Sequence, residues 1–247
     1  MNLLMRYFRR SAVGTAAIVL LSIGLCWAAD DNKNQTDAVV KRIDASAKVL
    51  DEIMATPDKA IPDKIMSDSK CIAVVPSMVK FAFIFGGDHG KGVATCRTAN
   101  GWSAPAPITL TGGSFGLQAG GQATDIVLVV MNDAGMQQLL SSKFKLGGDA
   151  SAAAGPVGRN AAADTDWKMK AEVLTYSRAR GIFAGIDLSG TAVTQDKDET
   201  QLLYGQPEPF ADILSGKVKA TVSSAPFLTA VKKYSTQAKE QKENSGD

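Results

Sequence analysis

The sequence predicts a single α+β domain with an antiparallel-rich sheet that is twisted or partly closed into a barrel. Three features predict this class: a helical period after the N-terminal segment, short apolar runs separated by turn signals, and a second helical period near the C-terminus. The 247 residues contain no repeat of fixed period and no linker long enough to divide them. We therefore expect one domain over residues 36–236 and a charged tail at residues 237–247.

Amphipathic helices are expected at both ends of this domain. Residues 36–55 place apolar side chains at spacings of three and four, with charged side chains on the opposite side, and Pro57 ends the helix. Residues 226–242 show the same period. Shorter helices are expected at residues 62–66, 133–142, 198–203 and 210–214.

The strands are expected where the period changes from helical to strand-like. These segments are short, rich in Val, Ile and Phe, and bounded by glycine-containing turns such as Asn100-Gly101. Glycines inside residues 108–119 predict bulges or close backbone approach. Residues 143–159 are predicted as a loop with one strand. Strands are expected at residues 71–75, 79–85, 91–98, 108–119, 124–131, 169–177 and 182–188.

Residues 1–29 have the pattern of an export signal. Three arginines precede an apolar run over residues 12–25, which is shorter than the ~20 residues of a spanning helix. Ala28 and Ala29 supply small residues for cleavage before a flexible leader at residues 30–35. Cys26 is a lipidation candidate, and an uncleaved anchor is the other alternative. Because Leu25 stands where a lipoprotein signal has a small residue, ordinary cleavage is favoured.

Export predicts an envelope or periplasmic location, with outer-membrane attachment if Cys26 is acylated. Removal of Cys26 leaves Cys71 and Cys96 in an oxidising compartment. An even pair of cysteines in an exported chain is a disulfide candidate. The alternative is two buried thiols, since cysteine is among the most buried residue types.

The charge balance excludes several function classes. The whole chain has 27 basic and 25 acidic residues, which is too balanced for a dedicated nucleic-acid binder. Residues 1–29 hold three arginines and no acid, so the chain from Asp30 has 24 basic and 25 acidic residues. One histidine and three cysteines are too few for most zinc sites, and we expect neither a metal nor a cofactor.

A catalytic interpretation rests on one short motif. Residues 112–116 match the G-x-S-x-G pattern of a nucleophile elbow, with Ser114 as the nucleophile. His89 is the only histidine, and it precedes Ser114 with no acid between them. This order fits neither the α/β hydrolases nor the chymotrypsin type, although an acid before His89 would allow the subtilisin order. We therefore expect a protein that is not an enzyme, with serine hydrolysis as an unfavoured alternative.

Basic residues beside apolar ones are typical of surfaces that bind anionic lipid, because charge attracts the headgroup and the apolar group inserts. The alternative is that the helix packs on its own domain and that the lysines are only solvated. Three candidates lie on the first helix, two flank Phe144 and two flank Ala179. These lipid-binding candidates are Lys41, Arg42, Lys48, Lys143, Lys145, Arg178 and Arg180.

Several longer motifs occur in order along the chain. They are GKGVA at 90–94, GWSAP at 101–105, TLTGGSFGLQAGGQATD at 109–125, IVLVVMN at 126–132, KFKLGGDAS at 143–151, GPVGR at 155–159, YSRARGIFAG at 176–185 and YG at 204–205. Together they resemble the SYLF domain, a lipid-binding domain also described as an actin-binding domain in yeast proteins. The resemblance covers about residues 37–235.

The resemblance implies binding of anionic lipids, with residues 36–55 in the place of the family's amphipathic segment. The SH3 and FYVE modules that accompany the domain in eukaryotes are not found in this sequence, and export makes actin an unlikely partner. Anionic phospholipid or a membrane surface is therefore the expected partner. The alternative is an envelope protein that binds another protein through its terminal helices.

Overall fold

A computed structural model of the chain describes residues 32–56, 60–82, 86–114, 122–158, 171–179 and 182–245. The predicted signal, Cys26 and Arg180 lie outside these ranges. The N-terminal helix covers residues 32–54, so it begins inside the predicted leader. The other helices are α2 (Asp63–Asp68), α3 (Asp133–Leu140), α4 (Lys197–Tyr204), α5 (Phe210–Leu214), the 3-10 helix η3 (Val222–Ser224) and α6 (Ala225–Ser245).

The strands form one curled sheet, a half-barrel, with the order β6-β10-β4-β2-β1-β5-β8-β7. Strand β3 pairs with β2, and β9 pairs with β8. All pairs are antiparallel except β7 with β8. The strands are β1 (Cys71–Ala82), β2 (Gly86–Thr98), β3 (Gly101–Trp102), β4 (Ala106–Ser114), β5 (Gln122–Val130), β6 (Lys143–Lys145), β7 (Ala152–Ala154), β8 (Val173–Ala179), β9 (Ile182–Gly185) and β10 (Ala192–Gln195).

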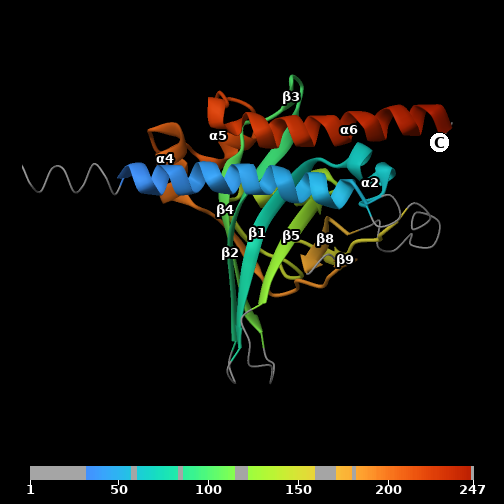
Figure 1. Cartoon of the computed structure of the whole chain (residues 1–247), viewed down its shortest axis with the longest axis horizontal. Coiled ribbons are helices and arrows are strands. Elements are labelled where there is room, and N and C mark those ends of the chain that lie inside the picture. The colour runs from blue at the N-terminus through green and yellow to red at the C-terminus, as the bar shows by residue number, and fades with distance from the viewer. Residues whose placement is uncertain are drawn as a thin grey trace, which may run out of the picture.

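Apolar side chains cover both faces of the central strands. Alternation along β1 sends Ile72 and Val74 into one core and Ala73 and Val75 into the other. The first core is closed by the N-terminal helix, α2 and α6, and the second by α3 and α5. Figure 1 shows the N-terminal helix and α6 crossing the same face of the sheet. The predicted α+β domain with helices at both ends is therefore confirmed.

Strand β1 joins two segments that the sequence predicts as separate strands. Pro76 and Ser77 interrupt its registers with β2 and β5, and Ser77 has a positive φ of 53°. Proline cannot donate to a ladder, so it is tolerated at a bulge. The Ser77 N–H instead donates to Asp125 Oδ1 at 2.9 Å. The bulge lets one strand continue, and the ends of β1, β2, β4 and β5 extend together beyond the helices (Figure 1).

Other boundaries differ from the prediction by whole turns or strands. Residues 143–159, predicted as a loop with one strand, contain both β6 and β7. Strand β9 ends at Gly185, three residues before the predicted end of that strand. Helix α6 continues to Ser245, through most of the predicted charged tail. Pairing with β10 makes β6 extended, and pairing with β8 makes β7 extended, although both segments are too short for a strand period to predict them.

Candidate functional site

The apolar side of the N-terminal helix is buried in the domain itself. Val39, Ile43, Leu50 and Ile53 are each at most 1% exposed and belong to the first core. Burying such a side chain stabilises the fold by about 1.5–3 kcal/mol, so the helix is an integral part of the core. In this conformation the apolar side is therefore not exposed to lipid, as expected if the helix packs on its own domain. Among the helices in the described ranges, none is long and apolar enough to span a bilayer.

The cationic candidates on this helix have different surroundings. Lys41 and Lys48 are exposed, and no carboxylate within the described residues pairs with either. Arg42 instead forms an ion pair with Glu199 of α4, and its side chain is largely buried. Of the three candidates, only the two lysines thus present an unpaired charge.

Arg42 belongs to a buried ion cluster that joins four elements. The cluster comprises Arg42, Lys91 of β2, Thr109 of β4, Asp196 and Glu199. Lys91 Nζ lies 2.7 Å from Asp196 Oδ2 and 3.0 Å from Glu199 Oε1. The Asp196 carboxylate also accepts from Thr109 Oγ1 at 3.1 Å and from the Glu199 backbone N–H at 3.0 Å, which caps α4. Two cations and two carboxylates therefore hold the N-terminal helix, the sheet and α4 together.

This arrangement changes the pKa of two of its members. Burial alone raises the pKa of Asp196, but hydrogen bonds from Lys91, the Glu199 N–H and Thr109 outweigh it and hold the pKa below its usual range. Burial alone lowers the pKa of Lys91, but the Asp196 and Glu199 carboxylates outweigh it and raise the pKa above its usual value. Both groups are therefore charged in the folded protein near neutral pH.

The depressed pKa of Asp196 predicts an acid-sensitive contribution to stability. Its contribution is present above the unfolded-state value of 3.8 and is lost as pH falls through the lower folded-state pKa. We expect Asp196→Asn to lower the urea midpoint at neutral pH and to flatten the decline of stability at acid pH. Urea titrations of both proteins from neutral pH to pH ~3 measure this. Parallel pH profiles of the two proteins would contradict the assignment.

Arg178 and Arg180 form another predicted pair of cations, and the structure describes only Arg178. Arg178 donates to Asp125 Oδ2 from Nε at 3.0 Å and from Nη2 at 2.7 Å. It also pairs with Glu52 of the N-terminal helix. Arg178 therefore ties that helix to β5 and β8, while Arg180 lies outside the described residues.

Strand β6 presents the last two candidates. Lys143 and Lys145 are exposed, while Phe144 between them is 2% exposed and belongs to the second core. The backbone N–H of Lys145 donates to the Asp149 carboxylate at 2.8 Å. Phe144 is thus not available for insertion into lipid, and the two lysines are a charged edge without an apolar anchor.

The residues of the catalytic interpretation lie apart in the register. His89 of β2 pairs with Thr111 of β4, whereas Ser114 pairs with Gly86. The two residues are three positions apart in this register, about 10 Å along the strands. Within the residues that the structure describes, no three His, Cys, Asp or Glu side chains gather as metal ligands.

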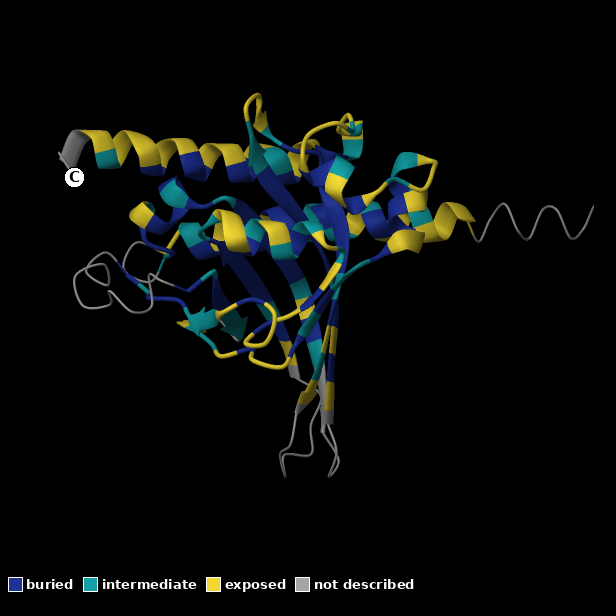
Figure 2. Cartoon of the chain, turned by 180° about the vertical axis from the view of Figure 1, so that it is seen from behind, coloured by how far each residue is buried: buried dark blue, intermediate teal, exposed yellow. Residues whose placement is uncertain are grey.

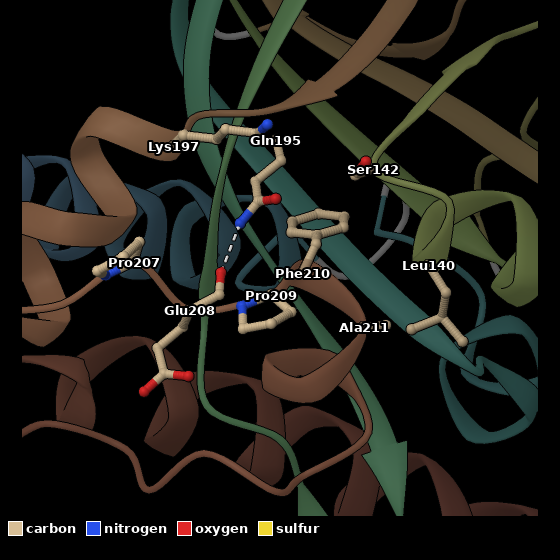
Figure 3. A pocket seen from close by; sticks show the side chains of 9 residues that line it. All are labelled: Leu140, Ser142, Gln195, Lys197, Pro207, Glu208, Pro209, Phe210 and Ala211. Carbon is tan, nitrogen blue, oxygen red and sulfur yellow. Dashed lines mark hydrogen bonds between the residues drawn. The ribbon is translucent and has the colours of Figure 1, made fainter.

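A groove of about 440 Å³ lies where α3, β10, α4 and α5 meet (Figure 3). Gln195 Nε2 donates across it to the Glu208 carbonyl oxygen at 3.0 Å. Sequence reasoning missed this groove, because its walls come from segments about 70 residues apart and only tertiary packing joins them. Its lining residues are Leu140, Ser142, Gln195, Lys197, Pro207, Glu208, Pro209, Phe210 and Ala211.

Comparisons with known proteins match most of this domain. The family model Ysc84, described as "Las17-binding protein actin regulator", matches residues 111–234. Protein YSC84 of Saccharomyces cerevisiae is 32% identical over 175 residues, which are 69% of this chain and 37% of the yeast protein. The SH3 domain-containing YSC84-like protein 1 of Xenopus laevis is 32% identical over 181 residues, 70% of this chain and 54% of that protein.

The mouse protein of the same name is 33% identical over 180 residues, 70% of this chain and 53% of its own length. This chain therefore spans about a third to a half of the relatives that it matches. The names of the relatives describe regulators and SH3-containing proteins rather than enzymes. The matched family model and the extent of the identity agree with the motifs and the half-barrel fold: this chain belongs to the Ysc84, or SYLF, domain family.

Proposed function

We propose that this chain is an exported, non-enzymatic protein that binds anionic membrane lipid through a local basic surface. The observation that carries the proposal is the division among its cations. Arg42 and Arg178 are used in internal ion pairs, whereas exposed lysines such as Lys41, Lys48, Lys143 and Lys145 have no carboxylate partner among the described residues. Since the chain from Asp30 is nearly neutral, such local surfaces must supply the attraction to lipid.

Vesicle co-sedimentation tests the proposal. The protein recovered from the producing cells, with its N-terminus determined by mass spectrometry, should pellet with phosphatidylcholine vesicles that contain phosphatidylglycerol and not with pure phosphatidylcholine. Raising the salt from about 0.1 M to about 1 M should release it, because the Debye length falls from about 10 Å to about 3 Å. Equal pelleting with both vesicle types at low salt would contradict anionic-lipid binding.

Charge-reversal variants then rank the predicted surfaces. Lys41→Glu with Lys48→Glu tests the N-terminal helix, and Lys143→Glu with Lys145→Glu tests β6. Arg42 and Arg178 are left unchanged, because altering them would break internal ion pairs and confuse binding with folding.

Export is proposed from the sequence of residues 1–29, and the cysteines are consistent with it. Cys71 and Cys96 are directly opposite in the β1–β2 register, and their sulfurs lie at bonding distance, 2.05 Å. Disulfides persist in the oxidising compartments that export reaches. Mass spectrometry of the mature protein reports the cleavage site, any acyl chain on Cys26 and the oxidation state of the pair.

Loss of this cross-link should destabilise the domain. The bond spans a sequence separation of 25 residues, so the loop-entropy model predicts that Cys71→Ser with Cys96→Ser lowers the free energy of unfolding by about 3.5 kcal/mol. Urea denaturation of the oxidised protein and of this double variant measures the difference. The double variant should not respond to a reductant, whereas the parent should lose similar stability in it. An unchanged parent midpoint after verified reduction would contradict the prediction.

A second candidate function is a protein-interaction module. The description of the family model names Las17 binding and actin regulation, and the groove beside α5 offers apolar and amide groups. Affinity capture from envelope extracts, by a protein that shows no preference for anionic vesicles, would favour this function over lipid binding.

A further inference from the structure

We propose that the outer side of α6 and the loop before it form the surface that docks on the anionic membrane. The inference rests on the proposed lipid-binding function and names the surface that performs it. We call this surface the α6 face, and it consists of Lys217, Lys219, Val222, Lys232 and Lys239.

Positive charge is segregated in this part of the chain. Residues 213–239 contain five lysines and no Asp or Glu, although the chain from Asp30 carries almost equal numbers of bases and acids. The β2–β3 turn, which reaches the same end of the molecule, belongs to residues 89–124, which also lack an acid. A local excess of cations attracts an anionic surface even when the whole protein is nearly neutral.

Three of the lysines keep their charge free for a ligand. Lys219, Lys232 and Lys239 are exposed, and none pairs with a carboxylate in the part of the chain that the structure describes. Lys217 is bound by Asp212 at 2.6 Å. Lys232 and Lys239 are seven residues apart, so they lie on the same side of α6.

Val222 gives the α6 face an apolar group that needs no rearrangement to reach lipid. It lies in η3, immediately before α6, and is 94% exposed, whereas Phe227 and Val231 of α6 are buried in the first core. A nearly fully exposed apolar side chain three residues after the free Lys219 is the combination that inserts below headgroups. The N-terminal helix, by contrast, would have to leave the core to offer an apolar side chain.

The arrangement of the elements lets the α6 face approach a flat surface. The loop before α6 contacts the β2–β3 turn, since a Cβ on Gly216 would lie 3.0 Å from Thr98 Cγ2. Trp102 Nε1 of β3 donates to Ser235 Oγ of α6 at 3.1 Å. Figures 1 and 2 place α6, the β3 turn and the loop after α5 at one end of the molecule, opposite the far ends of β1, β2, β4 and β5, with exposed residues along the outer side of α6.

The rival surfaces are less suited to an anionic membrane. Lys41 and Lys48 alternate with Asp37, Asp44 and Asp51 at spacings of three and four along the N-terminal helix. Alternating charge of this kind is typical of a solvated helix side. The β6 lysines surround a buried phenylalanine and lie near Asp149. Neither surface combines unpaired lysines with an exposed apolar side chain.

Vesicle binding by matched variants tests the α6 face. We expect Lys219→Gln with Lys232→Gln to weaken binding to phosphatidylglycerol-containing vesicles about 25-fold, or about fivefold for each lysine. Val222→Ser should weaken it about tenfold, since one apolar side chain no longer inserts. Lys33→Gln with Lys64→Gln removes the same charge from two exposed lysines outside the α6 face and should leave binding unchanged. All these side chains are exposed, and matching urea midpoints verify folding.

The outcomes separate this inference from the function on which it rests. If the parent protein binds and only the β6 or Lys41/Lys48 variants lose affinity, the α6 face is overturned and lipid binding stands. Loss on Lys219→Gln with Lys232→Gln but not on Val222→Ser overturns the insertion of Val222. A parent that does not distinguish anionic from neutral vesicles overturns both proposals.

Discussion

Gly92→Ala is expected to lower the free energy of unfolding by about 3 kcal/mol or more. Gly92 lies in β2 opposite the bulge of β1, and a Cβ there would lie 2.1 Å from the Val74 carbonyl oxygen and 2.7 Å from Val75 Cα. Both atoms belong to the backbone of the central strand, so a rotamer change cannot relieve the overlap. The substitution forces β1 and β2 apart at the centre of the sheet, and urea denaturation measures the loss.

Gly113→Ala is the matched control for this substitution. Gly113 lies in the adjacent strand β4, and a Cβ there meets no atom within 4 Å. Alanine in open space is expected to change stability by less than about 1 kcal/mol, in the stabilising direction if the unfolded chain loses entropy. An equal loss for both variants would mean that glycine is required by strand conformation in general and not by the bulge of β1.

The position of a strand can be predicted from the local sequence, but its neighbours in the sheet cannot. The apolar runs predict where the central strands lie, although they divide β1 in two, because burial between two layers selects Val, Ile and Leu locally. The glycines of residues 108–119 predict close backbone approach, but among the glycines that the structure describes, an added Cβ would come closest to another backbone atom at Gly92. Which strand lies against a glycine depends on sheet order and on the bulge at Pro76, and neither is encoded near the glycine itself.

The candidate site was predictable only in part, and for a similar reason. The sequence does not distinguish a cation that forms an internal ion pair from one that is free, because the carboxylate partner lies far along the chain. Arg42 meets Glu199 across 157 residues, and Arg178 meets Glu52 across 126. The helical period of residues 36–55 is confirmed, yet periodicity cannot distinguish an apolar side that faces lipid from one that faces the core. Val222 has no periodic context, so only its exposure in the fold reveals it.

Glu199→Ala is expected to lower the free energy of unfolding by about 3 kcal/mol, the lower end of the range for one partner removed from a buried ion pair, because the Arg42 and Lys91 side chains are 21% and 36% exposed. The Glu199 side chain is 9% exposed and accepts from both Arg42 and Lys91. Without it, Arg42 loses its carboxylate partner, and Lys91 keeps only Asp196. Like charges at low dielectric raise the energy of the folded state, and the N-terminal helix loses its attachment to α4. Urea denaturation and protease sensitivity near residues 32–54 both report the change.

Glu52→Ala supplies the matched control, because Glu52 also joins the N-terminal helix to an arginine but is 56% exposed. Arg178 retains Asp125 after that substitution, so the expected loss is below about 1 kcal/mol. A double-mutant cycle isolates the buried pair: Arg42→Met with Glu199→Gln should be less destabilising than the sum of the single changes, because no arginine is left unpaired. Additive changes in the free energy of unfolding, or equal losses for Glu199→Ala and Glu52→Ala, would show that the ion cluster does not hold the N-terminal helix against α4. Arg42 would then be as available to bind lipid as the lysines of the α6 face.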